Sequence, residues 1–141
     1  MNTINIRIAN LEDLDQIAAV DCAVIQNDSR KLILKKAIQE QKCLVGELSG
    51  KIEGFLTFHT DFFECSFISL VIVSPSARRK GLASRLIKEF IGQSPTEKVF
   101  SSTNESNIPM QKVFDSLGFE QSGIVHNLDE GDPEMIYFIR Q

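Results

Sequence analysis

The sequence has no tryptophan and a single tyrosine, so its aromatic content rests on ten phenylalanines. Its three cysteines, Cys22, Cys43 and Cys65, lack the Cys-x-x-Cys spacing of common metal and redox sites. This odd number argues against a disulfide framework, and we expect buried apolar thiols. Basic residues are outnumbered, with 15 Lys and Arg against 19 Asp and Glu and a formal net charge of −4. Since nucleic-acid binding depends on a basic surface, we expect no nucleic-acid partner.

Long apolar runs are also missing. The longest purely apolar stretch, Leu70 to Val73, is far shorter than the roughly 20 residues of a membrane helix. The first ten residues show no basic segment followed by an apolar one, so no secretory signal is visible. We therefore expect a cytoplasmic protein without membrane association. At 141 residues and 43% hydrophobic content, one core is expected, and hence a single domain over residues 1–141.

What is present is a regular succession of strand and helix patterns. Alternating isoleucines predict a strand over residues 4–8, and Asn10 with Asp13 predicts a capping box at the next helix. Ser29 is expected to cap a second helix, and Ser49-Gly50 to turn a hairpin. Further strands are expected at 62–73, 98–102, 120–127 and 134–140, and further helices at 81–91 and 107–117.

The resulting order is β-α-α-β-β-β-α-β-α-β-β, which indicates one mixed α/β (α+β) domain. The expected strand 62–73 is nearly continuously apolar from Phe67, as in a strand covered on both faces. Gly118 fits the left-handed position that closes a helix, and Phe119 supplies the usual apolar contact beyond it.

One segment, residues 71–85, combines an apolar strand, a basic turn and a helix start. The first N–H groups of a helix are unpaired and carry partial positive charge, so they favour phosphate. Gly81 and Ala83 would let the backbone approach a pyrophosphate, and the cations Arg78, Arg79 and Lys80 add attraction. The Walker and dinucleotide glycine motifs are absent. Alone, the segment predicts an anion at a helix N-terminus, with a solvated loop as the alternative.

The segment Val73 to Ala83 follows the pattern Val-x-Pro-x-x-Arg-x-x-Gly-x-Ala, which resembles the acetyl-CoA signature of the GNAT superfamily. Ala83 stands where Gly is commoner. Asn107 and the helix end Phe114 to Phe119 resemble the second signature of that family, and Arg7 to Ala9 resembles its usual start. The resemblance spans the chain. It implies a GNAT fold, a central mixed, mostly antiparallel sheet of about seven strands flanked by four helices.

The resemblance also implies acetyl-CoA as cosubstrate, without a metal. The strand end would contact the pantetheine arm through its backbone, and the loop and first helical turn would wrap the pyrophosphate. Asn107 would hydrogen-bond the CoA arm, with a helix cap as the alternative. The residues so assigned are Val71, Ile72, Val73, Arg78, Arg79, Lys80, Gly81, Leu82, Ala83, Ser84 and Asn107.

The implied chemistry is direct attack of an amine on the thioester. A backbone N–H near Ile72 or Val73 would polarise the thioester carbonyl. Many relatives place a proton-donating Tyr where this chain has Phe114, which cannot donate. Glu64, expected on the strand 62–73, and His59, expected at a strand end beside a turn, are candidate bases, with a chain of water molecules as the alternative.

The acidic loop between the last two strands is the candidate acceptor region. In the family this hairpin lies beside the acceptor, so Asp129 and Glu130 would attract a cationic amine, with a solvated loop as the alternative. The expected partner is a small-molecule amine or a protein amino group, and a homodimer is compatible with the sequence. The expected function is N-acetyl transfer from acetyl-CoA. The alternative is a catalytically weak acetyl-CoA-binding regulatory or partner-binding module, motivated by Phe114.

Overall fold

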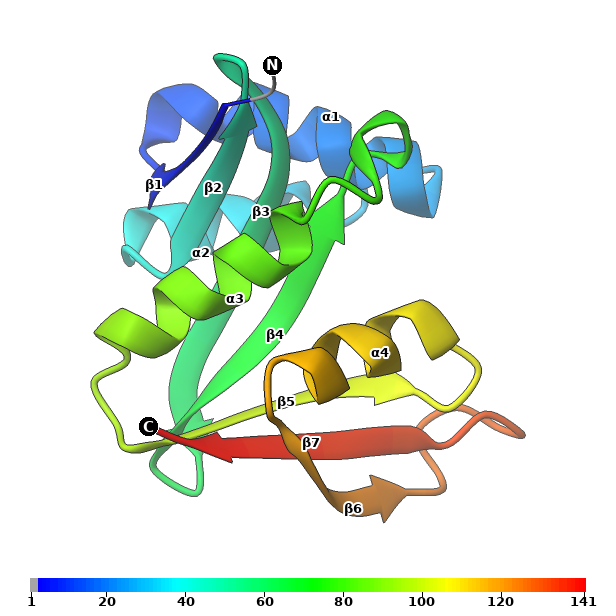
Figure 1. Cartoon of the computed structure of the whole chain (residues 1–141). Helices are drawn as coiled ribbons and strands as arrows, with labels where there is room; N and C mark the ends of the chain where they lie inside the picture. The colour runs from blue at the N-terminus through cyan, green and yellow to red at the C-terminus, as the bar shows by residue number, and fades with distance from the viewer. Residues whose placement is uncertain (1–2) are drawn as a thin grey trace. The chain divides into compact units, whose positions relative to one another are not determined.

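The structure of the chain, a computed structural model, describes residues 3–141 (Figure 1). Within these residues lies a seven-stranded sheet with strand order β1-β2-β3-β4-β5-β7-β6. The predicted mixed α/β fold, with seven strands and four α-helices in the predicted order, is confirmed. The elements are β1 (Ile4–Ile8), η1 (Leu11–Asp13), α1 (Leu14–Ile25), α2 (Lys31–Gln39), β2 (Cys43–Leu48), β3 (Lys51–Phe62), β4 (Cys65–Val73), η2 (Pro75–Ala77), α3 (Leu82–Gln93), β5 (Lys98–Asn104), α4 (Ile108–Ser116), β6 (Glu120–Val125) and β7 (Glu134–Arg140).

The sheet is mixed. Strands β4 and β5 are parallel, with Ser66, Phe67 and Ile68 opposite residues 99–101. The pairs β1/β2, β2/β3, β5/β7 and β6/β7 are antiparallel, which confirms the expected, mostly antiparallel arrangement. Among the described residues, no helix is both long and apolar enough to span a membrane.

Contacts along the chain gather into two compact units. The first comprises the residues up to Phe58 together with Leu70–Phe90, and the second comprises His59–Ser69 together with Ile91–Gln141. Strands β3 and β4 contribute residues to both units. A single domain over residues 1–141 stays a prediction.

In the first unit, α1 and α2 cover one face of the sheet and α3 covers the other (Figure 1). The core under α1 and α2 includes Cys43, which is 1% exposed, and burial raises the pKa of its thiol to about 12. This confirms the expectation of a buried thiol for Cys43. The same expectation is wrong for Cys22, which is exposed on α1. On the α3 face, the rings of Phe58 and Phe90 lie 4.4 Å apart.

The start of the first helical segment shows the predicted capping box. The Asn10 side chain accepts a hydrogen bond from the Glu12 N–H, and the Asp13 carboxylate accepts one from the Asn10 N–H. Arg7 of β1 donates two hydrogen bonds to Asp13, at 2.8 and 2.9 Å. The capping carboxylate therefore also ties β1 to this helix start. The predicted Ser29 cap is wrong, because α2 begins only at Lys31 and has no side-chain cap.

In the second unit, α4 packs on one side of β5 and β7 (Figure 1). The helix ends as predicted, since Gly118 has φ +90° and the Phe119 N–H donates to the Phe114 carbonyl at 3.0 Å. A chain of ring contacts joins phenylalanines of β3, β4, β5 and β7, with neighbouring centroids 4.9 to 5.4 Å apart. Its members are Phe62, Phe67, Phe100 and Phe138.

The two hairpin turns of the central strands differ in composition. Ser49 and Gly50 connect β2 and β3 as predicted, both with positive φ. Between β3 and β4 the positive-φ residues are Phe63 (+51°) and Glu64 (+65°), an unusual conformation for a bulky residue. The predicted strand 62–73 therefore begins too early, because residues 63 and 64 form the turn and β4 starts at Cys65.

Candidate cofactor site

The candidate site is built on the turn between β4 and α3, within the first unit. After Val73 the chain makes the short helix η2, in which the Ala77 N–H donates to the Ser74 carbonyl at 2.9 Å. The Ser74 N–H donates to the Glu53 carbonyl of β3 at 2.7 Å. Because Ala77 is also buried, the turn is anchored to the sheet on its inner side.

On its other side, where α3 begins, the turn faces solvent. Arg79 and Gly81 have positive φ, +65° and +79°, which turn the chain into the helix. The Arg85 N–H donates to the Gly81 carbonyl at 3.0 Å, so the amides before Arg85 belong to the first turn, where a helix offers no carbonyl partner. A Cβ atom at Gly81 would meet no atom within 4 Å. The space beside this backbone is therefore open to a ligand.

Three cations precede this helix start. Arg78, Arg79 and Lys80 are all exposed. None of them takes part in the ion pairs within 4.0 Å that residues 3–141 form. A cation without a protein carboxylate beside it is available to an anionic ligand. The structure thus brings together the predicted residues 78–84, at one helix N-terminus with a partial positive charge of its own.

The end of β4 supplies backbone groups next to the turn. The parallel pairing of β4 with β5 covers Ser66–Ile68. Val71, Ile72 and Val73 lie beyond that ladder and are partly exposed. An extended ligand with amide groups could pair with such a strand edge, as in β-strand addition.

Asn107 caps α4 in the second unit. Its Oδ1 accepts a hydrogen bond from the Met110 N–H at 3.2 Å, so the alternative role predicted for it is real. An asparagine amide has both an acceptor oxygen and an NH2 group with two donors. The cap uses the oxygen and leaves the NH2 to donate elsewhere, so capping does not preclude a second contact.

Phe114 is fully buried in the second unit. It is 0% exposed, and its ring contacts those of Phe119 and Tyr137 at centroid distances of 5.0 and 4.8 Å. Tyr137 is 4% exposed; burial raises its pKa, and the nearby Asp115 carboxylate adds to the effect. The phenol is therefore protonated at neutral pH.

The two candidate bases lie in places other than those expected. Glu64 is an exposed residue of the β3–β4 turn and not a residue of β4. His59 lies within β3 and not at its end, with its ring stacked on Phe67 at 5.5 Å. Its Nδ1 accepts a hydrogen bond from the Asp61 N–H at 3.1 Å. A neutral imidazole has one acceptor nitrogen, so its lone pair is already engaged.

The acidic loop between β6 and β7 is held by hydrogen bonds. Asp129 accepts one from the Asn104 side chain at 2.9 Å, and Asp132 accepts from both the N–H and the hydroxyl of Ser106. Of the two predicted acceptor residues, Asp129 thus has a structural partner, while Glu130 is exposed on the loop. The sequence did not predict that Asn104 and Ser106 anchor this loop. Each lies about 25 positions from its aspartate partner, which is too far for a local sequence pattern to reveal the contact.

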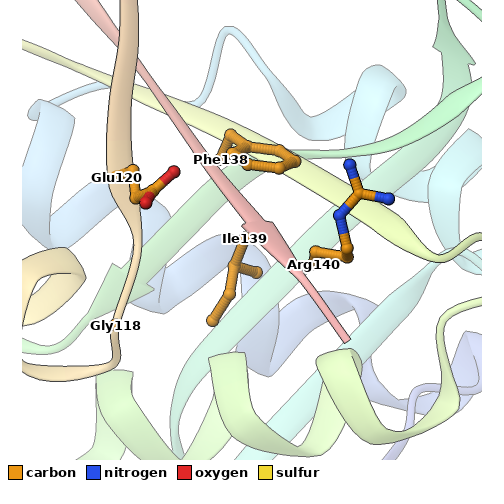
Figure 2. A pocket seen from close by; sticks show the side chains of 5 residues that line it. All are labelled: Gly118, Glu120, Phe138, Ile139 and Arg140. Carbon is orange, nitrogen blue, oxygen red and sulfur yellow. The ribbon is translucent and has the colours of Figure 1, made fainter.

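A hollow of about 410 Å³ lies elsewhere in the second unit, beside β6 and β7 (Figure 2). Figure 2 shows Phe138 and Arg140 on one side of β7 and Ile139 on the other. Glu120 and Gly118 complete the lining. None of the predicted site residues is among them, so we assign this hollow no part in cofactor binding. Among residues 3–141 no cluster of His, Cys, Asp and Glu could hold a metal ion.

Comparison with known proteins identifies the family of the chain. The sequence matches the acetyltransferase (GNAT) family over residues 11–119. A crystal structure of a GNAT family acetyltransferase from Bacillus cereus is 51% identical, with a TM-score of 0.96, covering 99% of this chain and 98% of that chain. A comparison with functionally curated protein sequences gave no match.

Two more distant structures share the fold. The ribosomal-protein-S18-alanine N-acetyltransferase from Escherichia coli is 17% identical, with a TM-score of 0.83, covering 99% of this chain and 94% of that chain. The candidate acetyltransferase yncA from Salmonella typhimurium, solved with its cofactor acetyl-CoA, is 18% identical, with a TM-score of 0.78 and coverages of 97% and 93%. With the family match over most of the chain, the conclusion is that this chain belongs to the acetyltransferase (GNAT) family.

Proposed function

We propose that this protein is an acetyl-CoA-dependent N-acetyltransferase that acts on a primary amine of a small molecule or of a protein. The observation that carries the proposal is the turn before α3. It combines three exposed cations that form no ion pair within residues 3–141 with a glycine of positive φ at a helix N-terminus. This donor set fits a pyrophosphate, which needs several N–H donors and positive charge at close range.

The first turn of α3 would bind the pyrophosphate through the amides of Leu82, Ala83 and Ser84. Small or inward-facing side chains leave this backbone accessible, since Leu82 is buried beneath the helix and the space beside Gly81 is open. Arg78, Arg79 and Lys80 would contribute charge from the exposed rim, together with the backbone of residues 78–81.

The β4 end would hold the pantetheine arm. Amide groups of the arm would pair with the backbone of Val71 and Val73, and the Asn107 NH2 would donate a further hydrogen bond. When bound, acetyl-CoA supplies a thioester whose acyl group passes to an amine, with release of the CoA thiol. A backbone N–H at Ile72 or Val73 would polarise the acyl carbonyl.

Proton transfer is the step for which the chain has the fewest candidate side chains. The acceptor ammonium must lose a proton before it can attack, and the leaving thiolate must gain one. Phe114 has no proton to give. Glu64 is exposed in a turn and the Nδ1 lone pair of His59 is engaged, so water is the base and the acid that the geometry favours.

For the acceptor, we propose only its chemical class, an amine. The similarity to the ribosomal-protein-S18-alanine N-acetyltransferase is a similarity of fold, so protein amino groups and small amines both belong in the test. Glu130 is the exposed carboxylate of the β6–β7 loop that would attract a cationic acceptor, and Asp129 would act with it from its hydrogen-bonded position.

The test is release of CoA thiol from acetyl-CoA over a panel of amines, comprising polyamines, amino acids, aminoglycosides and peptide N-termini. We expect at least one acceptor to raise thiol release well above the rate without amine. Acetyl-CoA binding without turnover on any amine would favour the second candidate, a regulatory acetyl-CoA-binding module. Phe114 motivates that alternative, because its ring cannot donate a proton.

A further inference from the structure

Two glycines face each other across β2 and β3, directly under the first residue of α3. Gly46 and Gly54 are paired in the antiparallel ladder of the first unit. Glycine weakens a strand interior, and its presence there often marks a close approach of another group. Neither residue is among the glycines of positive φ, so backbone conformation does not require glycine at these positions. At both positions, the Leu82 side chain contains the atom nearest to where a Cβ would lie.

The space above these glycines is filled by the two methyl groups of Leu82. A Cβ atom at Gly46 would lie 2.7 Å from Leu82 Cδ1 and 3.3 Å from Cγ. A Cβ atom at Gly54 would lie 3.0 Å from Leu82 Cδ2 and 3.1 Å from the Ile72 carbonyl oxygen. Carbon atoms in contact prefer separations of about 3.5–4.0 Å. A methyl group at either position would therefore have to displace Leu82 by up to about 1 Å.

Leu82 has little freedom to turn aside. It is 1% exposed, and each of its methyl groups rests on one of the two glycines. A rotation that turns one methyl group away from Gly46 would also move the other, which occupies the space beside Gly54. The simplest relief is for the first turn of α3 to rise from the sheet.

The first turn of α3 is where the proposed cofactor amides lie. Leu82 follows Gly81 directly, and the first helical hydrogen bond runs from Arg85 to Gly81. We propose that Gly46 and Gly54 form a notch that seats Leu82 and thereby sets the position of the pyrophosphate-binding amides. The inference rests on the proposed acetyl-CoA binding, and it assigns positioning roles to two residues that would not touch the cofactor.

The first test is the Kd of acetyl-CoA, measured by calorimetry for Gly46→Ala and for a matched control, Gly123→Ala. Gly123 is also a strand glycine without positive φ, but a Cβ atom there would meet nothing within 4 Å. We expect Gly46→Ala to weaken binding about 10-fold or more, since a 1 Å misplacement of binding groups is costly. The control should stay within about two-fold of the wild type.

Steady-state kinetics distinguish a misplacement of the cofactor-binding amides from a general loss of folded protein. In Gly46→Ala the KM for acetyl-CoA should rise while the KM for the amine stays unchanged. A merely structural role would leave both KM values of the folded fraction unchanged and lower only the amount of active protein. That result would overturn the notch assignment.

The decisive variant is the pair Gly46→Ala/Leu82→Ala, compared with Leu82→Ala alone. Removing the leucine methyl groups removes the clash, so the added alanine should change the Kd less than two-fold in this background. If Gly46→Ala does not fold, this pair still tests the idea. A pair that fails to fold where Leu82→Ala folds, or that again loses 10-fold in affinity, overturns the notch.

The outcomes also separate this inference from the proposed function. Wild-type protein that binds acetyl-CoA, together with an equally tight Gly46→Ala variant, would refute the notch and leave the function standing. Wild-type protein that binds no acetyl-CoA would refute both.

Discussion

The rings of Phe114 and Tyr137 are stacked, with centroids 4.8 Å apart and planes inclined by 24°. Many relatives in the family that the sequence resembles have a proton-donating tyrosine at the position of Phe114. The only tyrosine of the chain thus lies against that very ring, but on β7 and in the core. Phe114 is thus a buried packing residue of the second unit, and its ring offers no proton to a leaving thiolate.

Phe114→Tyr should keep turnover unchanged or raise it, because it adds a hydroxyl donor and removes no contact. The same hydroxyl enters a fully buried site, so we expect the free energy of unfolding to fall by about 1–2 kcal/mol. Thiol-release kinetics and urea unfolding measure the two effects. A loss of turnover beyond 10-fold in folded protein would mean that the Phe114 ring itself packs against substrate.

Asn107→Ser should separate the two roles of Asn107. Serine keeps a capping oxygen but lacks the NH2 donor, so we expect near-native stability together with weaker acetyl-CoA binding, by about 10-fold. Asn107→Ala is the comparison, since it also removes the cap and should cost about a further 1 kcal/mol of stability. Native affinity in Asn107→Ser would assign Asn107 to capping alone.

Asp13 should make the stability of the protein depend on pH in acid. The hydrogen bond from Arg7 is the main cause that lowers the pKa of Asp13 below its ordinary value of 3.8; burial opposes it, and the Asn10 N–H assists. A carboxyl whose pKa is lower in the folded state stabilises that state above its unfolded pKa. This contribution is lost as the pH falls below about 3.8 and through the lower folded value.

Asp13→Asn should therefore lower the free energy of unfolding by about 2 kcal/mol at pH 7. The difference from the wild type should shrink steadily below pH 3.8, because the wild-type carboxylate is then protonated as well. Urea unfolding at several pH values measures this. A difference that stays constant down to pH 2 would show that the charge on Asp13 contributes nothing.

Glu64→Gln and His59→Gln should each retain turnover within about three-fold. The reasons are the exposed turn position of Glu64 and the engaged Nδ1 of His59. The measurement is kcat/KM against pH for both variants. Loss of about 100-fold in one of them, with disappearance of the acidic limb of its pH profile, would identify that residue as the base after all.

The sequence predicted the fold well because its signals are local and repeated. Asn10 with Asp13 and Gly118 with Phe119 are short patterns whose hydrogen bonds form within a few residues, and both appear in the structure as predicted. The strand start at residue 62 was wrong because Phe63 is apolar and bulky, yet occupies a turn conformation that favours glycine or asparagine.

The site could be predicted only in part. The residues of the β4–α3 turn are contiguous, so a pattern reveals them together. The groups that fix this turn are distant in sequence: Glu53 anchors Ser74, and Gly46 and Gly54 lie under Leu82. Nothing near those residues in the sequence indicates a partner 21 to 36 positions away.

The most direct test of acetyl-CoA binding at the α3 N-terminus is calorimetric titration of wild-type protein and of Gly81→Glu. Gly81→Ala is the control for backbone conformation, since it shares the positive φ but adds no charge. We expect saturable wild-type binding, a modest loss in Gly81→Ala, and no detectable binding in folded Gly81→Glu, because bulk and negative charge would then occupy the pyrophosphate position. Equal affinity of Gly81→Glu and wild type, or no wild-type binding at millimolar acetyl-CoA, would contradict the assignment.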